Sequence, residues 1–278
     1  AILDLEKAYN IEIPDLSSQE GISWSVNRYF KQDSSGAVVE LCLRECQIES
    51  MTWLIDFPAL TELDLSGNHL SKIEGLASLT SLTRLNLSDN QISKLEGLAS
   101  LTSLRWLYLW GNQISNLEGL ASLTSLTTLS LSYNQISNLE GLASLTSLMA
   151  LDLSSNQLSN FKGLERLTSL RLLSLRNNQL SNLNGLASLT SLRLLFLSDN
   201  QLSNLEGLGR LKVLRELDIS DNKIQLVNDI RPLSPILEQT LENLRIHNNP
   251  FVEVSRLKLS PYENHLPEIK ALLEKEKR

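Results

Sequence analysis

"NQISNLEGLASLTSL" occupies residues 112–126, and the same fifteen residues return at 134–148. Close variants recur along the chain, at 68–82, 90–104, 156–170, 178–192 and 200–214. The aligned copies share the frame L-x-x-L-x-L-x-x-N, and its asparagines follow a step of 22 residues at positions 68, 90, 112, 134, 156, 178, 200 and 222. A strict period of this kind indicates one structural unit stacked repeatedly on itself.

The frame itself predicts how each copy folds. Its x-L-x-L-x centre alternates apolar and polar residues, which is typical of a short strand with two leucines pointing inward. Burying an apolar side chain contributes roughly 1.5–3 kcal/mol, whereas ordering a residue's backbone costs roughly 1–2 kcal/mol. One turn alone is therefore unstable, and stacking is needed to bury its leucines. The frame asparagine should bond the backbone of adjacent turns, and the glycines that follow should relieve a tight bend.

The frame resembles the leucine-rich repeat over about residues 38–250. It also fits "VVELCLREC" at 38–46, with Cys46 in the asparagine slot, and "LENLRIHNN" at 241–249, after a longer turn. The 22-residue length with "LEGL" resembles the class that includes internalins and phosphatase regulators. The resemblance implies an α/β fold, a right-handed solenoid or horseshoe. Its concave face would be a parallel β-sheet, and its convex face would have 3₁₀ turns and short helices.

The two ends depart from the frame and predict caps. Residues 1–37 should form an N-terminal cap, with a short helix at 1–9 and an alternating strand at 21–30 that forms a hairpin with the first repeat. Residues 38–250 then hold about ten repeats. Residues 251–278 form a C-terminal cap or linker, with a charged helix at 263–277.

Composition excludes several classes of partner and location. The formal net charge of −7 and a pI near 5.1 disfavour nucleic acid. No run of eighteen apolar residues is present to span a membrane, and the first residues lack the features of a signal peptide. Cys42 and Cys46 lie four apart in one predicted strand, too far for a disulfide, which favours a reducing, cytoplasmic location. The oligomeric state is left open.

Catalytic motifs for nucleotide, zinc or thiol chemistry are absent from the sequence. His69, His247 and His265 fall in unrelated contexts and are interpreted as ordinary surface histidines. We therefore expect no enzyme activity, no cofactor and no metal site in this chain. Acidic residues of the later turns (Asp199, Glu216, Asp218 and Asp221) could hold Ca²⁺, but a solvated polar rim paired with Arg176 and Arg245 is favoured.

Function is then expected where the copies differ. The third, fifth, seventh and eighth frame positions should point to the concave face. Four aromatic residues lie there on two adjacent turns, an apolar group lies on later turns, and small residues lie between them. The predicted partner-binding residues are Trp106, Tyr108, Trp110, Tyr133, Asp152, Leu172, Arg176, Leu194 and Phe196. Aromatic residues are enriched in interface centres; the alternative is that they only cover one another.

The two groups predict a trough on the order of 14 Å wide, because neighbouring strands lie about 4.8 Å apart. An α-helix is about 10–12 Å across, so one amphipathic helix of a partner protein would fit. Asp152 in a floor of serines and alanine would favour a lysine or arginine on that helix.

The repeats, the "NNP" exit at 248–250 and the charged helix after it resemble the leucine-rich-repeat domain of bacterial Roco proteins. That resemblance implies regulation of a GTPase domain downstream, whose motifs are absent here. The predicted function is protein recognition by the concave face, as part of such a protein. The alternative is a stand-alone or secreted adhesion or scaffold protein of the internalin type.

Overall fold

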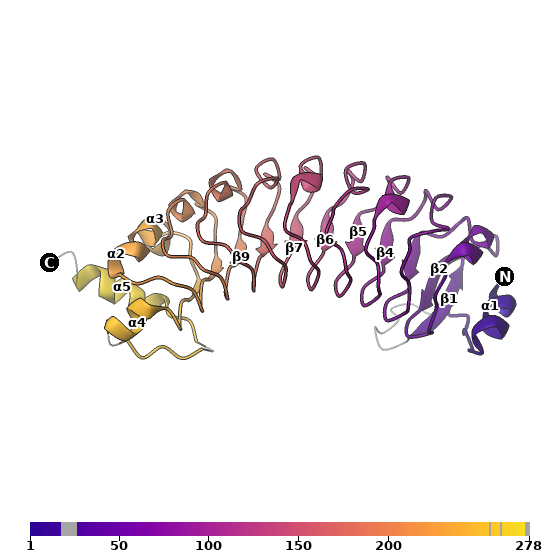
Figure 1. Ribbon diagram of the computed structural model, residues 1–278, viewed down its shortest axis with the longest axis horizontal. Helices are drawn as coiled ribbons and strands as arrows, with labels where there is room; N and C mark the ends of the chain where they lie inside the picture. The colour runs from indigo at the N-terminus through magenta and orange to yellow at the C-terminus, as the bar shows by residue number, and fades with distance from the viewer. Residues whose placement is uncertain (18–26, 256, 262, 276–278) are drawn as a thin grey trace. The chain divides into compact units, whose positions relative to one another are not determined.

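The computed structural model describes residues 1–17, 27–255, 257–261 and 263–275 (Figure 1). The chain divides into two compact units, residues 1–135 and residues 136–278. Each unit is a stack of repeat turns in which one short strand follows another in chain order. In the described ranges, no helix is long and apolar enough to cross a membrane.

The first unit is built on a sheet of short strands. Strand β1 pairs antiparallel with β2, and β2 to β6 then pair in parallel and in order. The strands are β1 (Arg28–Gln32), β2 (Val38–Leu43), β3 (Glu62–Asp64), β4 (Arg84–Asn86), β5 (Trp106–Tyr108) and β6 (Thr128–Ser130). The fourth and sixth frame positions are buried leucines, such as Leu107 and Leu109. The two leucines that alternate with polar residues in the frame therefore form the inward face of this sheet.

The second unit repeats the arrangement with parallel strands in chain order. Its strands are β7 (Ala150–Asp152), β8 (Leu172–Ser174), β9 (Leu194–Phe196), β10 (Glu216–Asp218) and β11 (Asn243–Arg245). The central leucines align in register from Leu151 to Leu244, and all are buried. The leucine-rich-repeat solenoid predicted from the period is confirmed in each unit.

Short 3₁₀ helices occupy the return legs of the turns, as the repeat class implies. They are η1 (Thr52–Asp56), η2 (Glu96–Leu98), η3 (Glu140–Leu142), η4 (Leu186–Ser188) and η5 (Leu208–Arg210). The glycine of this leg is needed at a close approach. In Gly119, φ is +94°, and an added Cβ would lie 2.3 Å from the carbonyl oxygen of Leu95 on the preceding turn. Gly163 repeats this in the second unit, 2.4 Å from the Leu139 oxygen.

The frame asparagine ties each turn to the one before it, as predicted. Asn112 Oδ1 accepts from the backbone N–H of Ile92 at 2.9 Å, and its Nδ2 donates to the Leu87 and Leu109 carbonyls. Asn178 repeats the pattern in the second unit with Leu158 and Leu153. The interior corner of the stack thus has its backbone groups satisfied by a side chain.

The N-terminal end covers the first open strand. Helix α1 (Ile2–Tyr9) precedes the segment 14–17, whose backbone bonds the outer edge of β1 at Phe30. In turn, β1 pairs with β2 and places Tyr29 opposite Cys42. Residues 21–26 of the strand predicted at 21–30 lie outside the described residues, and its last residues belong to β1, which ends at Gln32.

Cys42 stands between Leu41 and Leu43 in β2, so strand alternation turns it to the opposite face, yet it is only 2% exposed. Burial, and secondarily the charge of Asp64, raises the pKa of the Cys42 thiol to about 12. Its Sγ donates to the Asn27 carbonyl at 3.4 Å. Both Cys42 and Cys46 are buried thiols rather than partners in a disulfide.

The C-terminal end departs from the repeat pattern. The long turn before β11 holds α2 (Val227–Ile230), η6 (Arg231–Leu233) and α3 (Ser234–Leu237), which the frame does not predict. After β11 come α4 (Pro250–Val254) and α5 (Leu266–Lys275), and α5 lies within the charged helix predicted at 263–277. Residues 264–265 close the outer edge of β11. The His265 N–H donates to the Leu244 carbonyl at 2.8 Å, and Leu244 N–H donates to Asn264 Oδ1 at 3.0 Å.

Candidate partner-binding surfaces

Four aromatic side chains lie on consecutive turns of the first unit and form what we call the aromatic set: Trp106, Tyr108, Trp110 and Tyr133. Trp106 and Tyr108 begin and end β5, with the buried Leu107 between them, so both leave the outer side of the sheet. Trp110 follows β5 and is 43% exposed, and Tyr133 follows β6 and is 65% exposed. The outermost two therefore present most of the accessible aromatic surface.

Arg84 borders the aromatic set on the neighbouring strand. It pairs in register with Trp106, and its guanidinium carbon lies 5.2 Å from the Trp106 ring centroid. Its Nε is 3.7 Å from Glu62 Oε2 on the other side. Trp106 is thus partly covered by the Arg84 guanidinium on the side of β4. Tyr133 lies on the opposite side of β5, on the turn that follows β6.

Tyr133 stands in a backbone conformation that bulky residues seldom adopt. Its φ is +54°, in the left-handed region. The same frame position is left-handed in other turns, where most of its residues are Gly, Asp or Asn, and Glu45 and Ser155 are the exceptions. Glycine, aspartate and asparagine tolerate this region far better than tyrosine. An aromatic residue at this position is therefore not explained by the requirements of the turn.

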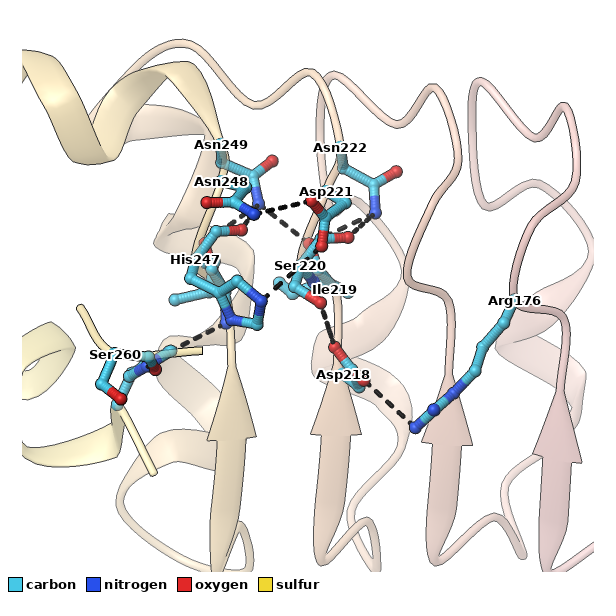
Figure 2. Close-up of polar contacts among 12 residues, drawn as sticks. Arg176, Asp218, Ile219, Ser220, Asp221, Asn222, His247, Asn248, Asn249 and Ser260 are labelled. Atoms are coloured by element: carbon cyan, nitrogen blue, oxygen red, sulfur yellow. Dashed lines mark hydrogen bonds and ion pairs between the residues drawn. The ribbon is translucent and has the colours of Figure 1, made fainter. Parts of the chain in front are cut away.

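A second, apolar set lies on β8 and β9 of the second unit. Leu172 pairs in register with Leu194, and all three members, including Phe196, are half-buried. The Arg176 guanidinium lies 4.5 Å from the Phe196 ring centroid and covers it. Arg176 also holds Asp218 through a 3.1 Å contact between Nη2 and Oδ2 (Figure 2). Phe196 is consequently less available to a partner than the sequence indicates.

Asp152 is already engaged within its own turn. Its Oδ1 accepts from the backbone N–H of Ser154 at 3.0 Å and from Ser154 Oγ at 2.6 Å. Asp218 makes the same turn with Ser220, so the Asp-x-Ser spacing is a local structural motif. The predicted role of Asp152 toward a cationic partner remains a prediction.

Of the small residues predicted as a floor, Ser132 is buried at 7% exposed, whereas Thr128, Ser130, Ala150 and Ser154 are half-buried. A small side chain on a sheet lies below the level of its taller neighbours, so alternation alone does not make it accessible. The aromatic set belongs to the first unit and the apolar set to the second, so we describe each set separately. The trough between them remains a prediction.

The last turns of the second unit hold a polar cluster that Figure 2 shows beside β10 and β11. Asp221 accepts from Asn248 Nδ2 at 2.8 Å and lies 3.6 Å from His247 Nε2. Partial burial, then the charges of Asp221 and Asp218, raises the pKa of Asp199. Among the described residues, no group of three or more His, Cys, Asp or Glu side chains is arranged to hold a metal ion.

The interpretation of His247 and His265 as surface histidines is wrong. His247 is 9% exposed and His265 1% exposed, and their rings contact edge to face with centroids 5.6 Å apart. His265 Nδ1 accepts from the Ile246 N–H at 3.1 Å, while Nε2 contacts the Ser260 carbonyl at 2.6 Å. This arrangement closes the end of the stack, and it depends on the fold of the C-terminal segment rather than on any local motif.

Comparison with known proteins agrees with this fold. A family described as leucine-rich repeats in two copies matches residues 58–100, 80–122 and 102–144, and one described as a leucine-rich repeat matches residues 144–160 and 211–226. None of the curated proteins matches the chain.

Solved structures give closer likenesses. Internalin C2 of Listeria monocytogenes is 35% identical with a TM-score of 0.65, over 69% of this chain and 83% of that chain. Another internalin of the same organism, inlF, is 25% identical with a TM-score of 0.61, over 78% of each chain. The ectodomain of the Arabidopsis thaliana receptor kinase GASSHO1/SCHENGEN3 was solved in complex with Casparian strip integrity factor 2. It is 24% identical with a TM-score of 0.62, over 88% of this chain and 34% of that chain, a likeness of fold. The protein thus belongs to the leucine-rich-repeat family, with repeats similar to those of internalins.

Proposed function

We propose that this chain is a protein-recognition module whose first unit binds a partner through the aromatic set. The observation that supports this best is Tyr133, a 65%-exposed aromatic residue in the left-handed backbone region. Strained residues of this kind persist where function favours them over the local optimum. Trp110 on the preceding turn adds a second exposed ring. Tryptophan and tyrosine are the residues most enriched among the energetic centres of interfaces.

The proposal concerns binding rather than catalysis. The polar groups described above are used within the fold, as in the Asp152–Ser154 turn and the Arg176–Asp218 pair. The aromatic set, by contrast, has apolar ring surface turned to solvent. Removing apolar surface from water contributes roughly 25 cal/mol per Å² to the free energy of association. A complex with a partner that has a complementary apolar face would therefore be stabilised.

The test is a selection of displayed helical and cyclic peptides against the full chain, followed by calorimetry of the selected binders. Trp110→Ala and Tyr133→Ala should each reduce the free energy of binding of the selected peptides by about 2 kcal/mol, the loss typical of central aromatic anchors. Glu118→Ala and Asn116→Ala, exposed residues of the return leg, are matched controls and should change affinity little. Binders that ignored both aromatic substitutions and depended on Glu118 would show that the wrong face was chosen.

We further propose that this recognition module is part of a bacterial Roco-type protein and controls a GTPase domain downstream. It is supported only by the repeat length, the "NNP" exit and helix α5. A nucleotide-binding motif in the gene downstream of residue 278 would support it. An export signal upstream of residue 1 would instead favour the internalin-like adhesion alternative.

A cytoplasmic location is likewise proposed, on the basis of the two buried thiols. Thiol titration of the purified protein in denaturant, without reductant, should find both Cys42 and Cys46 reactive. In the folded protein both should react slowly, because they are buried and the pKa of Cys42 is raised to about 12. A mass two hydrogens lower with no titratable thiol would contradict a reducing compartment.

A further inference from the structure

The residue directly before each repeat strand is threonine at β3, β4 and β6 of the first unit and Arg105 at β5. The threonine hydroxyls bond the preceding turn. Thr83 Oγ1 donates to the Thr61 carbonyl at 3.1 Å, and Thr127 Oγ1 donates to the Arg105 carbonyl at 3.0 Å. A threonine at this position therefore adds a hydrogen bond between successive turns.

In the second unit three successive turns place arginine there: Arg171, Arg193 and Arg215. The Arg193 N–H donates to the Arg171 carbonyl at 2.8 Å, and the Arg215 N–H donates to the Arg193 carbonyl at 2.8 Å. The three side chains thus leave adjacent rungs, about 4.8 Å apart, and all are exposed. Like charges side by side on a sheet are destabilising, so this row is not explained by stability.

The row has little counter-charge of its own. Arg215 Nη1 lies 3.4 Å from Glu242 Oε1, a pair with both side chains more than half exposed. For Arg171 and Arg193, no carboxylate of the described residues lies within ion-pair distance. Lys212 adds a further positive charge, because Arg193, Lys212, Arg215 and Glu242 line one surface hollow. Three cations and one anion meet there, in a chain whose formal net charge is −7.

Aliphatic side chains flank the arginines. Val213 lines the same hollow and is 43% exposed. Met149 precedes β7, accepts the Arg171 N–H on its carbonyl at 2.8 Å, and is 40% exposed. A nucleic acid backbone would offer phosphates to the arginines but little apolar surface to Met149 and Val213. A protein segment can offer both carboxylates and aliphatic side chains.

We propose that this basic edge, formed by Arg171, Arg193, Lys212 and Arg215, binds an acidic segment of a protein partner in which aliphatic residues accompany the carboxylates. Arginine is suited to this role because its planar guanidinium binds carboxylates in bidentate geometry. The edge is distinct from the aromatic set, which lies in the other unit. It therefore does not depend on the proposed function of that set.

The test uses a fluorescein-labelled glutamate-rich peptide with interspersed leucines, and its glutamine analogue, measured by fluorescence anisotropy at low ionic strength. The key variant carries Arg171→Thr, Arg193→Thr and Arg215→Thr, which installs the residue favoured in the first unit. We expect this variant to bind the glutamate peptide about tenfold more weakly, since three exposed ion pairs of modest individual strength are lost together. The glutamine peptide should bind weakly to both the unmodified chain and the arginine variant. Added salt should weaken binding of the glutamate peptide to the unmodified chain.

The matched control carries Lys72→Thr, Lys94→Thr and Arg105→Thr, which removes the same charge from exposed positions of the first unit. This control should change binding by no more than about twofold, as expected for surface substitutions outside the binding site. A second variant that carries Arg171→Gln, Arg193→Gln and Arg215→Gln repeats the test without the threonine hydroxyls.

Three outcomes would overturn the proposal. The unmodified chain could fail to bind the glutamate peptide, or the control variant could lose as much affinity as the arginine variant. Alternatively, a single-stranded oligonucleotide or a phosphatidylserine vesicle could bind the same arginines more tightly than the peptide. That last result would assign the edge to nucleic acid or membrane instead of an acidic protein.

Discussion

Asn112 and Asn116 are the same residue type four positions apart, yet their surroundings are opposite. Asn112 is buried and bonds the backbone of two turns, at Ile92 and Leu87 of the preceding turn and at Leu109 of its own. Asn116 is exposed and accepts one N–H, from Glu118 at 2.9 Å. At the scale of the residue, the contribution of an asparagine to stability therefore depends on whether water can replace the hydrogen bonds of its side-chain amide.

Asn112→Ala should lower the free energy of unfolding by about 2–4 kcal/mol, because it leaves several buried backbone groups without a partner. Asn116→Ala is the control and should cost about 0.5 kcal/mol, since water can satisfy the Glu118 N–H. Urea unfolding followed by circular dichroism measures both. Equal losses for the two variants would contradict the structural role assigned to the frame asparagine.

Asp199 is a residue whose charge opposes folding. Its pKa is raised in the folded protein by partial burial and by Asp221 and Asp218, so the folded state binds its proton more tightly than the unfolded state does. Stability from this group is therefore present at low pH and is lost as pH rises through the folded pKa. Asp199→Asn should raise the melting temperature at pH 7, by an amount equivalent to about 0.3–1 kcal/mol.

The same substitution should have little effect below the ordinary aspartate pKa of about 3.9, where Asp199 is protonated in both states. Asp89→Asn is the matched control, because Asp89 has the same frame position and a φ of +53°. It separates the preference of asparagine for this backbone region from the loss of charge beside Asp218 and Asp221. A gain at Asp199 that did not change with pH would contradict the electrostatic explanation.

At the scale of the element, the return leg of each turn is limited by how closely it approaches its neighbour. Gly119→Ala would place a methyl group 2.3 Å from the Leu95 oxygen at a φ of +94°. The clash adds to the backbone strain, so we expect a loss of about 3 kcal/mol or more.

Gly36→Ala separates these two effects. Gly36 also has a positive φ, +83°, but an added Cβ would meet nothing within 4 Å. Its substitution should cost only about 1 kcal/mol, the strain of the backbone alone. Thermal unfolding of both variants decides the matter, and a Gly119 variant no less stable than the Gly36 variant would show that the turns can separate freely.

At the scale of the whole molecule, the ends must protect a stack whose interior turns are stabilised only by their neighbours. At the N-terminus, α1, residues 14–17 and β1 cover β2 in succession. Removal of residues 1–36 would expose Leu41, Cys42 and the edge of β2.

This truncation should lower the melting temperature and produce oligomers, because an open strand edge pairs with other chains. Size-exclusion chromatography with light scattering, together with thermal unfolding, measures both effects. A truncated protein that stayed monomeric and melted at the same temperature would refute the cap. Truncation should leave the basic edge of the second unit competent to bind the glutamate peptide.

The periodic sequence by itself determined the strands, the buried leucines, the role of residues such as Asn112 and the need for Gly119. This is possible because each turn contacts mainly its neighbours, so a local pattern is also the packing pattern. The candidate residues of the aromatic set could likewise be read from the frame.

Only the tertiary structure decided which of those residues are accessible. Ser132 is buried although its frame position matches that of the exposed Trp110, and Phe196 is covered by Arg176 from the preceding turn. The contact of His247 with His265, and the helices α2 and α3, arise where the period is broken. Accessibility depends on the size and charge of side chains on adjacent strands, and these lie about 20 residues away in the sequence.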